Sequence, residues 1–521
     1  MRSLALSLAT QGFVTLRFDY EGTGDSSGGF NDLGRDRSWV ASVVQAADYL
    51  RSLGLRSISA VGMRLGATLI GVAADTHDTD FSSVVLWDPC ESGRSYLREL
   101  NALEALRREQ FQIVAGDAIE ASEFIFSPQA VEEIRNLSLS KTRSKSFGDR
   151  TLVMARNDRG VPKSLRSHLT DESVKWRTTN QQARLLDVDP LKAVLPDQAI
   201  DRIVTWLCES ADDRASFDVV PPRQEAVVAA QPNRFAVNER IVTIGPNQLF
   251  GVVTEPLGES EGPLVIMLNV ANEEHTGPAR LWVELARRWA GYGLRCARFD
   301  MTGLGDSPWL PGESEPPNYF HAWLDDVITA AGVLSPEDPS DTVFLGLCSG
   351  AYLAIEAGLA LQARGVCALN PPVSMDFIHA VDRLEGLPHS WMRQLGSRLK
   401  PVAMLDWGAA TLWNLLRLIL PSRYAIDLLE QLGKDEVDLF LLYTADDIAP
   451  FQNIPFFRKM DVRRLRDTSI RHIEFVPGLD HAMHFAEGRD RAVDLLDRHV
   501  LERFVGLDQG RNSDTATSDD A

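Results

Sequence analysis

The residue best suited to chemistry in this chain is a cysteine between glycines, Cys348, in the segment Gly346-Leu347-Cys348-Ser349-Gly350. An apolar run before it predicts a strand over 342–345, and a run of small residues after it predicts a helix over 351–361. A sharp turn between a strand and a helix exposes a nucleophile, and glycines keep side chains from clashing around it. The sequence therefore predicts Cys348 as a nucleophile. Two alternatives stay open, a buried structural cysteine and Ser349 as the nucleophile of a turn shifted by one residue.

A nucleophilic thiol needs a base, which in this order of elements follows the last strand near the C-terminus. His481 follows the apolar pair Phe475-Val476 and a Pro-Gly turn, which is the expected position. His484 lies three residues further on and is a competitor, whereas His472 precedes the strand and is interpreted as a surface residue. We therefore predict His481 as the base.

The acid that orients the base should end the preceding strand, where Asp446 and Asp447 follow an apolar run that begins at Leu439. A similar run begins at Leu152 in the first half of the chain and aligns Asp447 with Asp158. We choose Asp447, whose carboxylate would accept the imidazole N–H and stabilise the imidazolium.

Backbone N–H groups must stabilise the negative oxygen that forms when a carbonyl is attacked. The N–H of Ser349, directly after the nucleophile, and the N–H of Val270, in the loop after a predicted strand over 263–268, are predicted to form this oxyanion hole. His275 and Arg280 follow the loop and are candidates for substrate binding, Arg280 through a carboxylate or phosphate. The alternative for Arg280 is a structural role or a place on a helix surface.

Parts of the sequence occur twice. Residues 12–19 recur at 293–300, and Gly62-Met63-Arg64-Leu65-Gly66 recurs as the segment around Cys348. Arg64 stands at the position of Cys348, and its guanidinium is always protonated and has no nucleophilic capacity. No histidine occurs between His168 and His275, so the first half also lacks a base. The first copy is therefore predicted to be non-catalytic.

The elements that position these residues alternate between strand and helix, which predicts an α/β fold of two similar domains. Each domain is expected to be a mostly parallel sheet flanked by helices, with a helical cap that in the first copy covers 93–148. The predicted organisation is a degenerate copy over 1–208, a linker over 209–234, a catalytic copy over 235–507 and a disordered tail over 508–521. Strands of the first copy are predicted over 13–18, 57–61, 83–87 and 151–155.

The second copy opens with predicted strands over 240–244, 249–254 and 263–268. These strands have no counterpart ahead of residue 1, because residue 1 aligns with the interior of the helix that follows them. We expect either a first copy that is truncated at its N-terminus or a start of the protein further upstream.

Composition and motif spacing argue against several classes of function. A formal charge of -20 and the lack of a sustained basic run argue against nucleic acid as a partner. The five cysteines have no metal-ligand spacing, which favours free thiols in a reducing cytoplasm. No apolar run approaches the roughly 20 residues of a membrane span. Gly22-x-Gly24 and Gly303-x-Gly305 lack the third glycine of a dinucleotide loop, so we expect no cofactor and no metal.

On these motifs the chain resembles a tandem of α/β-hydrolase domains similar to the exosortase-A-associated hydrolases found near bacterial exopolysaccharide genes. The first half, with Arg64 in its turn and the segment Leu86-Trp87-Asp88-Pro89, resembles the type whose turn carries arginine. The second half, with Cys348 and the segment 298–307, resembles the type whose turn carries cysteine. The resemblance implies hydrolase or acyl-transfer chemistry of unassigned substrate, with a non-catalytic first domain.

The leading hypothesis is a cytoplasmic acyl hydrolase that acts on a small ester or thioester through Cys348, His481 and Asp447. The first alternative is an acyltransferase with the same triad and a sugar or other hydroxyl as acceptor, which a dry site under the Trp-rich segment 391–413 would favour. The second alternative is a non-enzymatic binding or scaffold protein. We expect the two halves to pack against each other.

Overall fold

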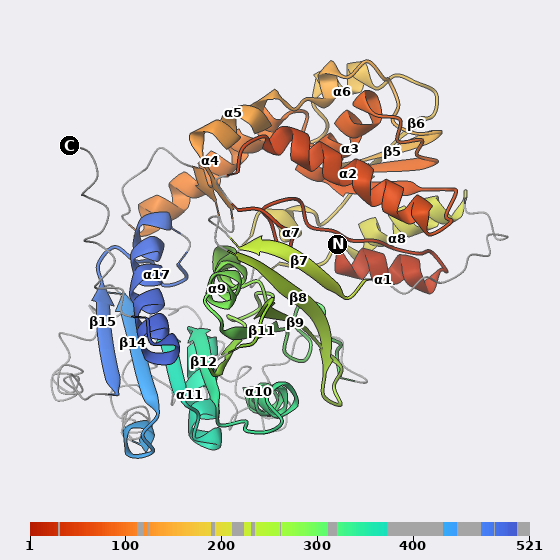
Figure 1. Ribbon diagram of the computed structural model, residues 1–521. Coiled ribbons are helices and arrows are strands. Elements are labelled where there is room, and N and C mark those ends of the chain that lie inside the picture. Colours follow the sequence, from red (N-terminus) through yellow and green to blue (C-terminus); the bar gives the residue numbers. More distant parts are fainter. Residues whose placement is uncertain are drawn as a thin grey trace, which may run out of the picture. The chain divides into compact units, whose positions relative to one another are not determined.

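The chain divides into two compact units, residues 1–223 (unit 1) and residues 224–521 (unit 2), shown in Figure 1. The computed structural model describes residues 1–29, 32–111, 119–121, 124–188, 193–210, 223–230, 235–260, 262–310, 320–371, 431–444, 470–483 and 485–507. The predicted tail over 508–521 and the Trp-rich segment 391–413 lie outside the described residues.

Unit 1 is built on a parallel sheet of four strands in the order β1-β2-β5-β6. The strands are β1 (Ser59–Met63), β2 (Ser83–Trp87), β5 (Arg150–Arg156) and β6 (Val174–Thr179). The predicted strands over 57–61, 83–87 and 151–155 are confirmed as β1, β2 and β5, and β6 was not predicted. The helices are α1 (Arg2–Thr10), α2 (Arg35–Ser52), α3 (Leu65–Thr76), α4 (Gly93–Phe111), α5 (Pro128–Asn136), α6 (Lys163–His168), α7 (Ala183–Leu186) and α8 (Asp197–Cys208).

Helices cover both faces of this sheet, which explains why every residue of the inner strand β2 is buried. Val84 and Leu86 of β2 pack with α2 and α3, whereas Val85 and Trp87 pack on the opposite face with α1 and α8. Figure 1 shows these two pairs of helices on opposite sides of the strands. The predicted cap over 93–148 contains α4 and α5, together with a short ribbon of β3 (Ile119–Ala121) and β4 (Phe124–Phe126).

The predicted strand over 13–18 is wrong, because residues 13–20 form no strand in the structure. Its counterpart in unit 2 is β11 (Arg295–Phe299), which lies between β10 (Leu264–Met267) and β9 (Leu249–Pro256). The described part of unit 1 contains no counterpart of either neighbour. An apolar segment becomes a strand only when another backbone pairs with it, and that pairing cannot be read from the segment alone.

Unit 2 is built on a sheet of nine strands in the order β15-β14-β13-β12-β10-β11-β9-β8-β7. The strands from β15 to β11 are parallel, and β9, β8 and β7 add antiparallel strands at one edge. The remaining strands are β7 (Glu225–Ala230), β8 (Phe235–Ile244), β12 (Thr342–Leu347), β13 (Gly365–Leu369), β14 (Asp438–Thr444) and β15 (Arg471–Val476). The predicted strands over 240–244 and 249–254 are confirmed as β8 and β9, whereas β7 lies within the predicted linker over 209–234.

Two pairs of helices cover the sheet of unit 2. Helices α9 (Leu281–Ala290) and α17 (Ala486–Val500) pack on one face, with Val265, Leu345 and Leu442 of the strands. Helices α10 (Phe320–Leu334) and α11 (Ser349–Leu361) pack on the other, with Ile266, Phe344 and Leu441. Alternate residues of each strand thus face opposite layers, and the C-terminal ends of the parallel strands are left to carry loops.

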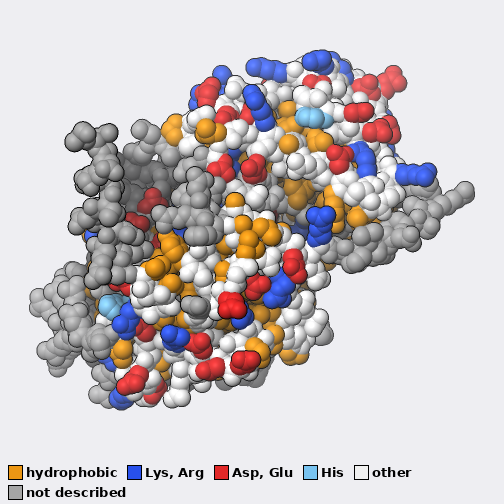
Figure 2. Space-filling model, in the orientation of Figure 1, with side chains coloured by type: hydrophobic (Ala, Val, Ile, Leu, Met, Phe, Trp, Pro, Cys, Tyr) orange, Lys and Arg blue, Asp and Glu red, His pale blue; other side chains and the backbone are white. Residues whose placement is uncertain are grey.

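A buried cluster of charges fixes the antiparallel edge of unit 2 to α9. The Glu239 carboxylate on β8 accepts hydrogen bonds from Arg298 Nη2 at 2.7 Å, from Arg287 Nη2 at 2.7 Å and Nε at 3.1 Å, and from Thr254 Oγ1 at 3.0 Å. Arg298 is fully buried, and Glu239 and Arg287 are nearly so. One carboxylate therefore holds two arginines out of water. On the outer surface, by contrast, acidic and basic side chains are interspersed over the face seen in Figure 2.

Candidate active site

Cys348 occupies a strained turn between β12 and α11. Its backbone has φ 53° and ψ −116°, values that are rare for a residue with a side chain, and its N–H donates to Leu369 O at 2.9 Å. The turn leaves no room beside it, because a Cβ on Gly346 would lie 2.1 Å from Gly350 O. The thiol of Cys348 is partly exposed. Ser349 is the first residue of α11, so the structure places Cys348 at the centre of the turn.

The loop that follows β10 touches this turn directly. The Ala271 N–H donates to Ser349 Oγ at 2.8 Å, and Ala271 itself has a positive φ of 50°. Val270, the predicted oxyanion donor, precedes Ala271 and is 5% exposed. The loop after β10 and the start of α11 are therefore in contact directly beside Cys348.

Asp300, which directly follows β11, accepts hydrogen bonds from residues of the same loop. Its Oδ1 accepts from the His275 N–H at 2.7 Å and from Asn269 Nδ2 at 3.1 Å, and its Oδ2 lies 2.9 Å from His275 Nδ1. Burial by itself raises the pKa of Asp300, but His275 and the hydrogen bonds from Asp306 and Asn269 keep that pKa below its ordinary value. The ionised carboxylate thus ties both ends of the loop together.

The two residues predicted to bind substrate lie inside the protein. His275 is 3% exposed and is paired with Asp300, and Arg280 is 5% exposed. Arg280 Nη1 lies 3.9 Å from Glu284 Oε1, one turn further along α9. These contacts favour a role in holding the loop over direct contact with a substrate.

Asn370 brings His481 to the same end of the sheet as Cys348. Its Nδ2 donates to His481 O at 2.9 Å, and its Oδ1 accepts from the Thr444 N–H at 2.8 Å. Asn370 directly follows Leu369, whose carbonyl accepts from the Cys348 N–H. The backbones of the predicted nucleophile and base are therefore anchored on consecutive residues at the end of β13.

Sequence reasoning missed Asn370 and the linking role of Asp300. A signal for Asn370 existed, because Asp88 stands at the same place in the first half, after a buried strand and before a proline. Asp446, Asp447 and His484 lie outside the described residues; β14 ends at Thr444. His472 is exposed at the start of β15, at the opposite end of that strand from His481.

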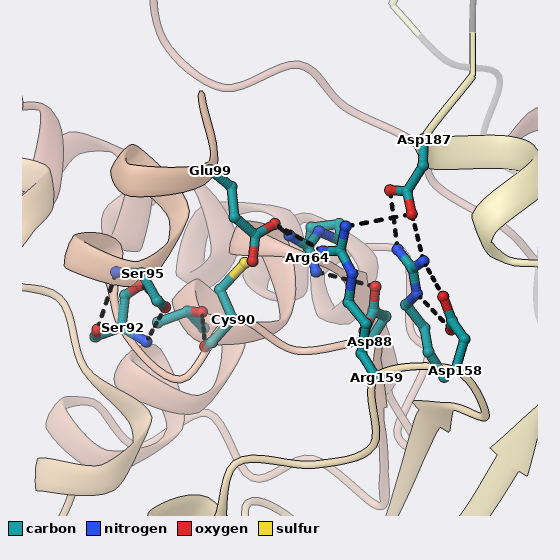
Figure 3. A network of polar contacts seen from close by, with 11 residues as sticks. Arg64, Asp88, Cys90, Ser92, Ser95, Glu99, Asp158, Arg159 and Asp187 are labelled. Atoms are coloured by element: carbon teal, nitrogen blue, oxygen red, sulfur yellow. Dashed lines mark hydrogen bonds and ion pairs between the residues drawn. The ribbon is translucent and has the colours of Figure 1, made fainter. Parts of the chain in front are cut away.

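Unit 1 repeats the turn with a different central residue. Arg64, between β1 and α3, has φ 55° and ψ −122°, and its N–H donates to Trp87 O at 3.0 Å. Its guanidinium donates to Asp88 Oδ2 at 2.9 Å and forms an ion pair with Glu99 of α4 (Figure 3). The backbone thus matches that of Cys348, but the side chain is committed to carboxylates.

Asp158, which aligns with the predicted acid Asp447, is also part of a charge network. Arg156 Nε donates to Asp158 Oδ1 at 3.0 Å, and Arg156 Nη1 donates to Asp187 Oδ1 at 3.0 Å (Figure 3). The hydrogen bonds from Arg156 lower the pKa of Asp158 to about 2. Cys90, which lies beside Arg64 in Figure 3, is buried, and burial raises the pKa of its thiol to about 12. The Cys90 thiol is therefore protonated at neutral pH and is not suited to act as a nucleophile.

The strand order of unit 2 and the strained turn after β12 define the α/β-hydrolase fold. Residues 275–495 match the family model described as "Alpha/beta hydrolase family". Unit 2 thus has the α/β-hydrolase fold, and most of it is similar to that family. No curated protein sequence matches the chain.

Several solved structures are similar to about half of the chain. They include acetyl xylan esterase 1 from Thermoanaerobacterium sp. JW/SL YS485, with 14% identity, a TM-score of 0.32 and coverage of 55% of this chain and 89% of that one. The thioesterase domain from the curacin biosynthetic pathway has 16% identity, a TM-score of 0.31 and coverage of 50% and 99%. An esterase of Pyrococcus furiosus has 17% identity, a TM-score of 0.29 and coverage of 53% and 96%.

Among the described residues, no group of three or more His, Cys, Asp or Glu side chains could hold a metal ion. Within the same residues, no helix is both long enough and apolar enough to span a membrane.

Proposed function

We propose that unit 2 is an acyl hydrolase that cleaves a small ester or thioester with Cys348 as nucleophile, His481 as base and Asp447 as acid. The observation that carries the proposal is the strained turn that presents Cys348 toward the loop held by Asp300. The placement of His481 by Asn370 supports the choice of base.

In the proposed reaction, His481 takes the proton of the Cys348 thiol, and the thiolate attacks the acyl carbonyl. The N–H groups of Ser349 and Val270 stabilise the oxyanion, and the leaving alcohol or thiol takes the proton from His481. Water then attacks the Cys348 thioester with His481 as base, which releases the carboxylic acid and restores the thiol. Asp447 would orient the imidazole, while His275 and Arg280 would support the loop.

Replacing His481 with alanine is expected to lower kcat for p-nitrophenyl acetate by roughly a thousandfold or more, because the base acts as a unit with the nucleophile. Asp447→Asn should cost less, since the acid only orients and stabilises the imidazole. His472→Ala and Asp446→Asn serve as matched controls and should retain nearly full activity. Loss of activity in Asp446→Asn with a silent Asp447→Asn would show that the acid is one residue earlier, and a fully active His481→Ala would exclude this triad.

Unit 1 is proposed to be the non-catalytic copy of a tandem, corresponding to the arginine type of the exosortase-A-associated hydrolases, with unit 2 as the cysteine type. The pairing of Arg64 with Asp88 and Glu99 supports this reading, because it fills the position of the nucleophile with a fixed cation. The proposed location of the whole protein is the cytoplasm, where the thiol of Cys348 would stay reduced.

Introducing a thiol into unit 1 by Arg64→Cys should give no esterase activity. The double variant Arg64→Cys with Cys348→Ala isolates any contribution of unit 1, because unit 2 is then silenced. A nucleophile without a base and an oxyanion loop cannot turn over, since these groups act together. Turnover of p-nitrophenyl acetate by the double variant, above that of Cys348→Ala alone, would overturn the assignment of unit 1 as non-catalytic.

A further inference from the structure

A groove lies within unit 1 between α8 and β6, the strand at the end of the sheet opposite β1. Its volume is about 790 Å³, which is within the range of pockets that hold small organic ligands. Alternate residues of β5 and β6 line it, so their side chains project from one face of the sheet, the face that α1 and α8 cover (Figure 1). Leu152 and Met154 of β5, together with Trp206 of α8, form its apolar wall.

The groove is basic, although the chain as a whole carries a formal charge of -20. Its polar lining includes four cations and two carboxylates, which are Arg150, Lys175, Arg177 and Arg202 against Asp201 and Glu209. Arg150 Nη2 lies 3.2 Å from Glu209 Oε2. Lys175, Arg177 and Arg202 form no ion pair with any residue that the structure describes. The groove therefore has an excess of positive charge that an anion can neutralise.

Main-chain carbonyls hold these three cations in place. Arg202 of α8 donates to Thr178 O, near the end of β6. Lys175 Nζ donates to Glu172 O at 3.2 Å, and Arg177 Nη1 donates to the carbonyl of the preceding residue at 3.0 Å. A carbonyl is a neutral acceptor, so it orients a cation without cancelling its charge. The remaining N–H donors of the three side chains stay available for a ligand.

The other end of the groove is closed by Arg150, which stacks on an aromatic ring. Its guanidinium carbon lies 3.8 Å from the centroid of the Trp206 ring, and its Nη2 donates to Trp206 O at 2.8 Å. Trp206 is half-buried, so part of its ring faces the groove. This end thus offers an apolar surface, whereas the charges without a carboxylate partner lie along β6 and at the start of α8.

The same position in unit 2 shows how the charge is balanced when no ligand is needed. Strands β5 and β14 both have seven residues, and each begins opposite the first residue of its neighbour, so Arg150 corresponds to Asp438. Asp438 is buried; its Oδ1 lies 2.7 Å from His499 Nε2, and its Oδ2 accepts from Arg503 Nε at 2.7 Å. One acid thus meets the basic groups of the last helices in unit 2. Unit 1 has a cation in place of that acid.

We propose that the groove of unit 1 binds a small organic phosphate, with its phosphate at Lys175, Arg177 and Arg202 and its apolar body against the wall that includes Trp206. A phosphate monoester carries up to two negative charges and several acceptor oxygens, so it can meet several cations at once, whereas a carboxylate carries one charge. The negative charge of the whole chain disfavours a long polyanion such as nucleic acid. Unit 1 thereby has a ligand of its own, which does not depend on the chemistry of Cys348.

The probe is 1-naphthyl phosphate, titrated into the full chain by calorimetry. We expect saturable binding that weakens as salt is added, because the cations are close to solvent. The Kd should be at least about tenfold lower than that of 1-naphthol, which lacks the charge, and that of inorganic phosphate, which lacks the apolar body. Absence of binding, or equal binding of 1-naphthol, would overturn the proposal. Tighter binding of 1-naphthoate would overturn the choice of a phosphate in favour of a carboxylate.

The double variant Lys175→Met with Arg177→Met tests the position of the ligand. Both side chains are exposed on β6, so the variant should melt as the parent does, while its affinity for 1-naphthyl phosphate falls at least about tenfold. The matched control is Lys163→Met with Arg184→Met, which removes the same charge from exposed positions of α6 and α7 and should bind as the parent does. Unaltered affinity in the groove variant, or an equal loss in both double variants, would overturn the proposed site.

Discussion

Cys348→Ala is expected to abolish turnover of activated esters, with a fall in kcat of roughly a thousandfold or more. The variant loses the only atom that can form the thioester, while alanine adopts the strained φ of the turn about as well as cysteine does. The unfolding temperature should therefore stay within about 2 °C of the parent protein, because the change removes one partly exposed sulfur. Both quantities are measured on the full chain, by p-nitrophenyl acetate hydrolysis and by a thermal melt.

Cys208→Ala is the matched control, since Cys208 is an exposed thiol at the end of α8 in unit 1. It should retain full activity. Mass spectrometry of the parent protein mixed rapidly with substrate should place the acyl group on the peptide that contains Cys348. Activity above a tenth of the parent in Cys348→Ala, or an acyl group on Ser349, would show that cysteine is not the nucleophile.

Glu239→Ala is expected to destabilise unit 2 by about 3–5 kcal/mol, because it leaves a buried pair of arginines without their shared carboxylate. Arg298 is fully buried, so its charge has no route to solvent in the folded state. The free energy of unfolding is measured by denaturant titration, with the transitions of the two units fitted separately.

Glu255→Ala is the control for this loss. Glu255 lies on β9, is only half-buried and is linked to Asn238 by a long hydrogen bond of 3.4 Å. Its removal should change the free energy of unfolding by less than about 0.5 kcal/mol. If Glu239→Ala lowers the free energy of unfolding by less than about 1 kcal/mol, the two arginines have found other partners. The cluster would then not be the link between β8 and α9.

The sequence was sufficient to predict the elements around the site whose signals are local. The glycines around Cys348 and the apolar runs of β2, β5 and β14 are patterns of adjacent residues, and the structure has those elements. The strand over 13–18 was wrong because pairing depends on a distant backbone. The junction made by Asp300 was not foreseen for the same reason, since its partners are 25 and 31 residues away in sequence. Asp447 stays a prediction.

A strained turn can be required by the fold or by catalysis, and a single enzyme domain does not tell these two reasons apart. The turn in unit 1 does, because its central residue is an arginine. Arg64 has nearly the same dihedral angles as Cys348, although its side chain is paired with Asp88 and Glu99. The same close packing surrounds the turn in both units, because a Cβ on Gly62 would lie 2.6 Å from Gly66 O and a Cβ on Gly346 would lie 2.1 Å from Gly350 O. The stability of the fold is then enough to keep the outline of this turn, whichever residue stands at its centre. Glycine spacing alone therefore does not distinguish the two units, which differ in the side chain at the centre of the turn.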